Sequence, residues 1–169
     1  MPATYEPIAT TTLGSAASTI TFSSITSSYT DLVLILVGTF SVNNKGVGIR
    51  LNSDTGSNYS LTSLVGDGTS AASSSINSFD YAWGTYNMAF SDTIPAVIRL
   101  DFLNYAGNTN KTFLGSGSGD RNGTGRVERN VQLWRNTAAI NSITLSAYTS
   151  GSADFNAGTT ATLYGILKA

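Results

Sequence analysis

ITLSAY, residues 143–148, alternates apolar and polar side chains, and TATLYGI, residues 160–166, alternates in the same way. Side chains on an extended strand point to its two faces in turn, so a period of two predicts a strand with one buried and one solvated face. No stretch of ten residues has a clear period of 3.6, which would indicate a helix. The chain is therefore expected to be all-β. Four further segments repeat the alternation: residues 19–25, 47–51, 97–102 and 131–134.

A continuous apolar run covers residues 31–40, DLVLILVGTF. Such a run predicts a central strand that is covered on both faces. Polar turn residues separate the runs, and about eight to ten short strands result, as in a sandwich of two sheets. We expect an antiparallel β-sandwich with a jelly-roll-like arrangement. The turns fall at residues 43–46, 54–58, 66–68 and 104–110.

Two segments look least like strands: residues 115–125, GSGSGDRNGTG, and residues 70–78, SAASSSINS. Glycine and small polar residues are typical of loops, so both segments are expected to be long and mobile. Loops of this length are often ordered by a neighbour, which indicates a partner subunit. Residues 1–18, which hold two of the three prolines, are expected to form an extended N-terminal arm on another chain, and residues 19–169 a single sandwich domain.

The composition excludes several classes of function. The chain of 169 residues contains no histidine and no cysteine, which removes the commonest general base, thiolate catalysis, zinc sites of the cysteine type and disulfides. Nine basic and ten acidic residues leave a net charge of −1, so no strong field attracts a nucleic acid or a membrane surface. The most apolar run is far shorter than the ~20 residues that span a bilayer, and no secretory leader is expected. With 23 serines and 23 threonines, the surface is expected to be neutral and rich in hydroxyls.

Two short motifs are compatible with catalysis or ligand binding but have simpler explanations. Residues 54–57, DTGS, match the short signature of aspartic proteases, in which two carboxylates share one proton. No second Asp-Thr-Gly occurs and polar residues precede Asp54, so a turn explains the motif better. The glycine-rich segment lacks both the Lys-Ser/Thr of a phosphate-binding loop and the carboxylates of a calcium site. We expect no enzyme activity, no cofactor and no metal.

Two kinds of catalytic group stay open at this point. A serine nucleophile would need one of the three lysines as its base, Lys45, Lys111 or Lys168. A glycosidase would need two carboxylates at a set separation, which a sequence does not show. The candidate carboxylates are Asp67, Asp80, Asp92, Asp101 and Glu128.

Aromatic residues cluster in residues 79–90, FDYAWGTYNMAF. Tyr81, Trp83 and Tyr86, together with Trp134, are candidates for a platform on which sugar rings stack. The spacing of two between Phe79, Tyr81 and Trp83 favours a different interpretation, in which they form one face of a strand packed in the core or at a subunit interface.

Four arginines fall within fifteen residues: Arg121, Arg126, Arg129 and Arg135. A guanidinium forms two parallel hydrogen bonds to a carboxylate, so Arg121, Arg126 and Arg129 are candidates for contacts between subunits. Two acidic residues lie among them, and local ion pairs of a solvated loop are the alternative.

Both ends of the chain carry a family resemblance. Residues 4–25, TYEPIATTTLGSAASTITFSSI, with YTDL at 29–32, DTGSNYS at 54–60 and TTATLYGI at 159–166, resemble a family of virion structural proteins of tailed bacteriophages, including those of cyanobacteria. The resemblance implies a β fold, a homo-oligomer and a particle as partner. It places such a protein on the outside of the virion, as a capsid cement or decoration protein or as part of a fibre.

The resemblance leads to a first expectation about function. The chain is expected to be a non-enzymatic decoration protein, a homotrimer that assembles in the host cytoplasm, binds the major capsid protein and stabilises the shell from outside. The alternative is a carbohydrate-binding tip or fibre domain that recognises host-surface glycans through the aromatic residues named above. Neither expectation includes nucleic acid or a membrane.

Overall fold

The computed structural model describes residues 4–43, 46–86, 90–120, 123–148 and 153–167, and they contain strands and no helix. The all-β prediction is confirmed, although the described residues form twelve strands, more than the predicted number. The strands are β1 (Tyr5–Thr12), β2 (Thr19–Phe22), β3 (Asp31–Gly38), β4 (Gly46–Leu51), β5 (Tyr59–Gly66), β6 (Ala71–Phe79), β7 (Ala82–Trp83), β8 (Ala96–Phe102), β9 (Lys111–Gly119), β10 (Arg126–Trp134), β11 (Ile143–Tyr148) and β12 (Thr160–Ile166).

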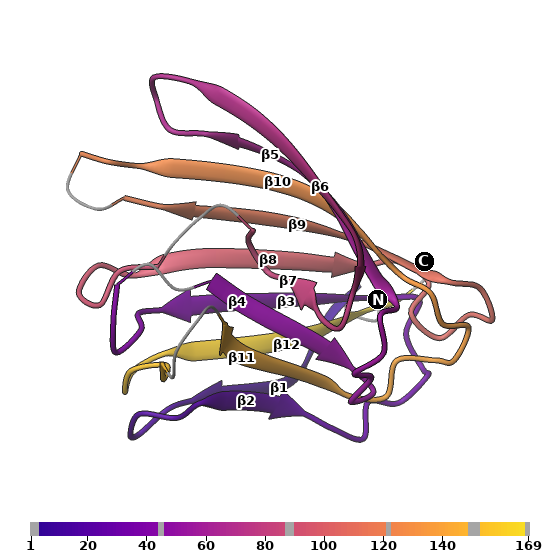
Figure 1. The fold of residues 1–169 in the computed structure, drawn as a ribbon. Helices are drawn as coiled ribbons and strands as arrows, with labels where there is room; N and C mark the ends of the chain where they lie inside the picture. Colours follow the sequence, from indigo (N-terminus) through magenta and orange to yellow (C-terminus); the bar gives the residue numbers. More distant parts are fainter. Residues whose placement is uncertain (1–3, 44–45, 87–89, 121–122, 149–152, 168–169) are drawn as a thin grey trace.

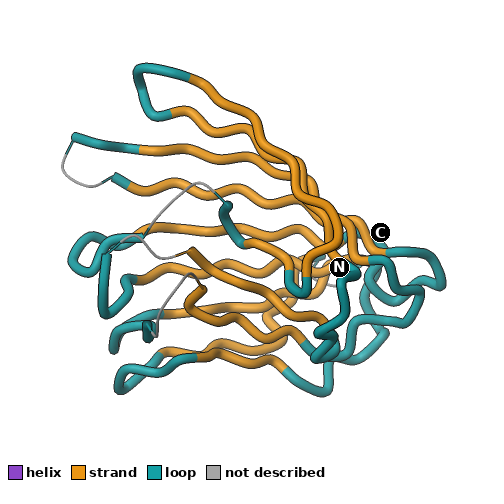
Figure 2. Tube along the Cα trace, in the orientation of Figure 1, coloured by secondary structure: helices purple, strands orange, loops and turns teal. Residues whose placement is uncertain are grey.

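Two antiparallel sheets face one another, so the predicted β-sandwich is confirmed (Figure 1). Eight strands form the long sheet in the order β1-β12-β3-β8-β9-β10-β5-β6. Four strands form the short sheet in the order β2-β11-β4-β7. The tube in Figure 2 shows the strands running across the molecule with loops at both ends.

The strand order contains a jelly roll. Without the hairpins β5–β6 and β9–β10, the sheets read β1-β12-β3-β8 and β2-β11-β4-β7. Numbered along the chain, these eight strands have the order 1-8-3-6 and 2-7-4-5, which is the arrangement of two Greek keys in a jelly roll. The two hairpins are insertions that continue the long sheet beyond β8 (Figure 1).

Side chains between the two sheets form the core, and the alternation in the sequence decides which ones they are. On β8, Ile98 and Leu100 are buried while Val97 and Arg99 point to the other face. The short sheet contributes from its own inward positions, such as Leu145. Burial of these alternate apolar side chains is the main favourable term in folding.

The first eight residues of the apolar run at 31–40 form β3, which lies between β12 and β8 and is therefore central, as predicted. Its inward side chains Leu34 and Leu36 are buried in the core. On the opposite face Val33 is also buried, but Val37 is 43 % exposed. The second face of this strand is thus covered along part of its length.

The prediction of long loops at 70–78 and 115–125 is wrong for the residues that lie in β6 and β9. In β9 the glycines have a packing role, because Gly115 pairs with Asn130 and Gly117 with Glu128 across the β9–β10 hairpin. A Cβ atom at Gly115 would collide with the side chain of Asn130. Glycine within a strand often marks such a close approach, so Gly115 makes room for its large neighbour.

The expected N-terminal arm takes part in the sandwich of its own chain. Residues 5–12 form β1, which pairs with β12 from Tyr5 opposite Ile166 to Thr12 opposite Thr160. The side chain of Ile8 packs against the core. These residues are extended, as expected, but within this chain they are an edge strand of the long sheet.

Candidate functional site

The face of the long sheet that points away from the short sheet, called here the outer face, carries exposed aliphatic side chains. Val127 is 62 % exposed and Leu64 is 57 % exposed. Alternate side chains of a strand share one face, which places these residues opposite the buried side of β10 and β5. Six exposed aliphatic residues occupy the outer face: Val37, Leu64, Val97, Leu114, Val127 and Val131.

The register of the strands brings these side chains together. Val37 pairs with Val97, Val97 with Ser118, and Ser118 with Val127, so one row crosses four strands from β3 to β10. At a strand spacing of about 4.8 Å, the row is about 14 Å long. Leu114 pairs with Val131 further along β9 and β10. Exposed apolar side chains gathered on one face of a sheet in this way indicate an interaction surface.

A shallow depression of about 680 Å³ lies along this row. It is lined on the sheet by Val37, Val97 and Val127, and at its margin by Pro95 and Asp120. Small-molecule sites enclose most of their ligand, whereas this depression is open. It is better suited to receive side chains that protrude from another protein.

Few charges interrupt the outer face. Arg99 on β8 donates hydrogen bonds to the carboxylate of Asp101, the shortest of 2.6 Å, and to the hydroxyl of Tyr5 at 3.0 Å. The hydrogen bonds to Asp101 raise the pKa of Arg99 above its ordinary value. Arg129 of β10 is exposed among the aliphatic residues and pairs across the strands with Leu64. Specific protein interfaces combine such apolar patches with arginine at low overall charge.

The structure does not place Arg126 and Arg129 on one surface. Arg126 and Arg129 are three residues apart on β10, so their side chains point to opposite faces. Arg126 lies beside the turn that contains Asp67. Arg135 is exposed just beyond the end of β10, and Arg121 lies outside the described residues. Contacts of these arginines with another subunit stay a prediction.

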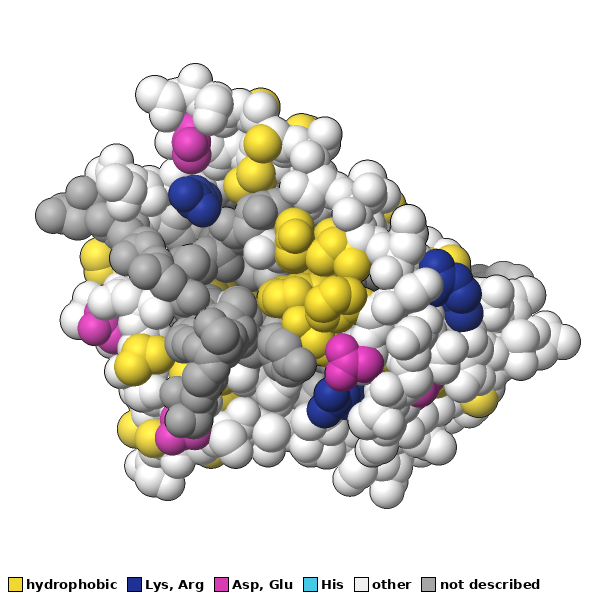
Figure 3. All heavy atoms as spheres, in the orientation of Figure 1, with side chains coloured by type: hydrophobic (Ala, Val, Ile, Leu, Met, Phe, Trp, Pro, Cys, Tyr) yellow, Lys and Arg dark blue, Asp and Glu magenta, His cyan; other side chains and the backbone are white. Residues whose placement is uncertain are grey.

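The structure brings three of the four candidate aromatic residues together. Phe79, Tyr81, Trp83 and Tyr86 form a chain of ring contacts, with ring centroids 4.8 Å apart for Tyr81 and Trp83 and 5.3 Å apart for Trp83 and Tyr86. Tyr81 is 3 % exposed and Trp83 is 7 % exposed. They form a small second core with Leu61 of β5. Hydrophobic side chains are visible on the surface over β7 in Figure 3, but most of this cluster is packed within the chain.

Trp134, the fourth candidate, lies elsewhere, in the main core. Its side chain is fully buried and stacks on Tyr59 at a centroid distance of 6.3 Å. The indole N–H donates a hydrogen bond of 2.7 Å to the carboxylate of Asp54. A fully buried ring has no face for a ligand, so Trp134 supports the fold.

A row of buried polar side chains on β10 attaches the aromatic segment to the long sheet. Gln132 accepts a hydrogen bond of 2.8 Å from the backbone N–H of Trp83 and donates one to the carbonyl of the same residue. Glu128 accepts a hydrogen bond of 2.8 Å from the backbone N–H of Tyr86. Asn130 lies between them and donates to Glu128 at 3.3 Å. These three side chains, called here the polar row, replace the backbone pairing that a further strand would provide.

Sequence reasoning missed the polar row. In VERNVQLW, residues 127–134, two patterns overlap, because Val127 and Val131 alternate with Glu128 and Gln132. From hydrophobicity alone, the valines are expected to be buried and the polar side chains exposed. The structure buries the polar residues instead and exposes the valines on the outer face. The signal available in the sequence was that Glu128, Asn130 and Gln132 continue the two-residue spacing that ends at Trp134. They therefore share a strand face with this buried residue.

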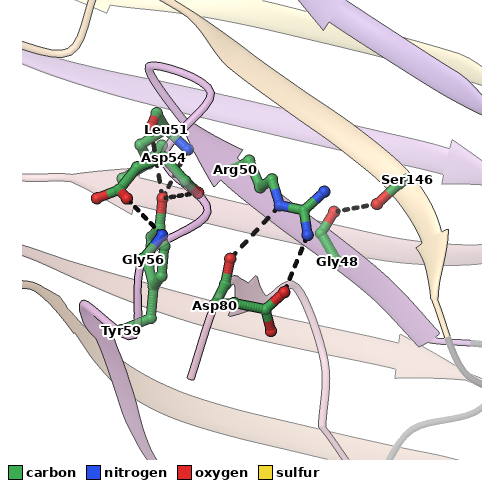
Figure 4. A network of polar contacts seen from close by, with 8 residues as sticks. All are labelled: Gly48, Arg50, Leu51, Asp54, Gly56, Tyr59, Asp80 and Ser146. Atoms are coloured by element: carbon green, nitrogen blue, oxygen red, sulfur yellow. Dashed lines mark hydrogen bonds and ion pairs between the residues drawn. The ribbon is translucent and has the colours of Figure 1, made fainter. Parts of the chain in front are cut away.

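Asp54, the residue of the protease-like motif, organises a turn. Its carboxylate accepts hydrogen bonds from the backbone N–H of Gly56 at 2.8 Å, the side chain of Asn58 at 2.8 Å and Trp134. Burial alone would raise the pKa of Asp54, but the hydrogen bonds from Trp134, Asn58 and Gly56 outweigh it and lower that pKa. Figure 4 shows this turn beside β4, with the Tyr59 hydroxyl close to the backbone of Leu51 and Asp54. The interpretation of the motif as a turn is confirmed.

Other carboxylates left open as catalytic groups also have structural partners. Asp80 forms an ion pair of 3.0 Å with Arg50 of β4 (Figure 4). Asp67 accepts hydrogen bonds from the backbone N–H groups of Thr69 and Ser70 in its own turn, which lowers its pKa. Asp101 pairs with Arg99, and Glu128 belongs to the polar row.

Lys111 is the one candidate lysine that lies within the described residues. Its ammonium group is buried and donates hydrogen bonds to the carbonyls of Gly107 at 2.7 Å, Thr109 at 2.5 Å and Thr137 at 3.2 Å. Burial lowers the pKa of Lys111. Its hydrogen bonds connect the loop after β8 to the loop after β10. Lys45 and Lys168 lie outside the described residues.

The described residues contain no group of three His, Cys, Asp or Glu side chains that could bind a metal ion. The same part of the chain holds no helix of the length and apolarity that a membrane span requires. No protein-family model matches the chain, and no curated protein matches it. The geometry of the outer face alone therefore identifies it as the candidate functional site.

Proposed function

We propose that this chain is a non-enzymatic structural protein of a bacteriophage virion, a decoration protein that binds the outer surface of the capsid and stabilises the shell. The observation that carries the proposal is the outer face, where six aliphatic side chains are exposed on a sheet with few charges. Leaving these side chains in water is unfavourable unless another protein covers them. The resemblance of the chain ends to tailed-phage virion proteins supplies the identity of that protein, the major capsid protein.

The rest of the molecule suits this function. The candidate catalytic groups Asp54, Asp80 and Lys111 are engaged in turns, ion pairs and loop contacts. A jelly roll without disulfides folds in a reducing compartment such as the host cytoplasm, before it adds to the particle. A protein that binds only the assembled lattice then stabilises that lattice by mass action.

A binding experiment tests the proposal. Purified chain is added to purified particles that lack it, the particles are sedimented, and the bound copies are counted by quantitative gel analysis. We expect saturable binding at a fixed number of copies per capsid and a higher temperature of DNA release. Failure to bind such particles, or absence of the chain from mature virions, would contradict the proposal.

Substitutions on the outer face locate the contact. Val127→Asp puts a charge at the most exposed aliphatic position, and we expect the dissociation constant for particles to rise at least about tenfold because a charge would be buried at the interface. Val42→Asp is the matched control, since Val42 is 41 % exposed but lies in the bend after β3. Equal binding by both variants would exclude the outer face as the contact.

The alternative, a carbohydrate-binding tip or fibre domain, receives less support. Its platform needs exposed aromatic rings, whereas Trp134, Tyr81 and Trp83 are buried, and Tyr86 is half-buried. A glycan array with the purified chain tests this function directly. Micromolar binding that Tyr86→Ala abolishes, without loss of the fold, would favour it over capsid decoration.

A further inference from the structure

Each sheet of the sandwich has two edges, and the four edge strands differ in how they are protected. The long sheet ends at β1 and β6, and the short sheet ends at β2 and β7. A free edge presents unpaired N–H and C=O groups, which are a template for pairing with another strand. Natural proteins protect such edges with charges, prolines, bulges or very short strands.

Three of the edges are protected. In β1, Glu6 places a charge and Pro7 removes a donor, and the register of its pairing shifts between Pro7 and Ala9. β2 consists of four residues and β7 of two, which are too short to support a stable pair.

β6 has none of these protections from Ala71 to Ile76, and the one irregularity in its pairing with β5 lies at its end, between Ile76 and Phe79. Its nine residues, AASSSINSF, include no charge and no proline. From Ala71 to Ile76 its pairing with β5 is regular, and β5 is its one neighbour among the described strands. Six of its nine residues are exposed and the other three are half-buried.

We propose that β6 pairs with β6 of a second copy of this chain, antiparallel about a two-fold axis, so that two long sheets become one continuous sheet. An isologous contact requires a surface that is complementary to itself, and an uncharged strand brings no repulsion when it meets its own copy. With Ser74 on the axis, Ala72 faces Ile76 of the other copy and Ser73 faces Ser75 of the other copy. Small side chains opposite larger ones allow close packing.

The neighbouring outer face adds to this contact. Leu64 of β5 pairs with Ser73 of β6, so this exposed aliphatic side chain lies one strand from the new junction. Across the junction, paired residues are ~5 Å apart, which brings the outer faces of both copies into a single surface. The pairing gives an assembly of two-fold symmetry, which differs from the homotrimer of the first expectation about function, and it does not depend on capsid binding.

Charge pairs test the inference. Ser73 and Ser75 are exposed on the outer face. A two-fold axis at Ser74 places Ser73 opposite Ser75 of the other copy, and an axis at Ser75 places Ser75 opposite itself. Either register therefore brings like charges at these positions together. We expect the unmodified chain to have twice the chain mass in sedimentation equilibrium at tens of micromolar. Ser73→Asp/Ser75→Asp and Ser73→Lys/Ser75→Lys should each raise the dimer dissociation constant at least about tenfold, because like charges face one another. An equimolar mixture of the two variants should restore the dimer.

Thr10→Asp/Thr12→Asp is the matched control, because it places the same charges at the same spacing on β1, the opposite edge of the sheet. This variant should remain dimeric. The inference is overturned by a monomer or a trimer of the unmodified chain, by dimers that tolerate the like charges, or by variants that do not recover on mixing. Hydrogen exchange of the unmodified chain gives a second test, since exchange at residues 71–77 must slow as the chain concentration rises through the dissociation constant.

Discussion

At the scale of single residues, Asp54 shows how one carboxylate holds a turn against the core. Three hydrogen bonds from Gly56, Asn58 and Trp134 favour its charged form and lower its pKa. A carboxyl whose pKa is lower in the folded chain stabilises the fold above its unfolded pKa of about 3.9, and this stabilisation is lost as the pH falls through the folded pKa. The turn should therefore weaken in acid.

We expect Asp54→Asn to lower the free energy of unfolding by about 1–3 kcal/mol at pH 7, because charged hydrogen bonds are lost and an amide donor faces other donors. The difference from the unmodified chain should shrink below about pH 4, where Asp54 itself becomes protonated. Urea unfolding at pH 7, 5 and 3 measures both effects. Ser57→Ala, in the same turn and exposed, is the control and should change little. A difference that stays constant with pH would contradict this account.

At the scale of elements, β10 joins two parts of the molecule that do not share a backbone ladder. Gln132 bonds both the N–H and the C=O of Trp83, and Glu128 bonds the N–H of Tyr86. These bonds hold the segment around β7 over the inserted hairpins. Leaving a buried backbone group without a partner costs about 1–3 kcal/mol, so the polar row contributes strongly to the position of this segment.

We expect Gln132→Leu to lower the free energy of unfolding by about 2–4 kcal/mol, since two buried backbone groups of Trp83 lose their partner. Hydrogen exchange should accelerate at residues 82–86 more than in the main core. Val131→Thr serves as the control, because Val131 is the adjacent residue on the exposed face of the same strand. Unchanged exchange at residues 82–86 would show that the polar row does not hold the segment.

At the scale of the whole molecule, β1 closes one end of the long sheet. It pairs with β12 along seven residue pairs, and Ile8 packs against the core. The N-terminal segment therefore contributes to the stability of the sandwich, in addition to any contact it makes with another chain. Its removal would expose the edge of β12 and part of the core.

We expect deletion of residues 1–12 to lower the melting temperature by roughly 5–15 °C, the effect of losing several kcal/mol in a chain of this size. Deletion of residues 1–3 is the control and leaves β1 intact. Differential scanning calorimetry of both truncated chains makes the comparison. If the chain without residues 1–12 has the same melting temperature as the full-length chain, β1 adds nothing to the stability of the sandwich.

The fold class could be read from the sequence, because strict alternation of apolar and polar residues indicates an extended strand with one buried and one solvated face. The segment 143–148 and the segment 160–166 form β11 and β12, and the apolar run forms the central strand β3. The glycine-rich and serine-rich segments could not be read in the same way. Their strands depend on partners, β10 for β9 and β5 for β6, and a partner strand supplies hydrogen bonds that composition does not reveal.

The candidate site could not be predicted, because it depends on which face of β10 is covered. The sequence by itself determined the all-β class and the turn at Asp54, which follow from local spacing and turn chemistry, whereas the jelly-roll order of the strands was decided by the tertiary structure. Tertiary structure alone decided that Glu128 and Gln132 are buried and that Val127 is exposed. The physical reason is that the buried face of β10 meets the backbone of residues 83–86, which needs hydrogen-bonding partners, so polar side chains are more favourable there than valine.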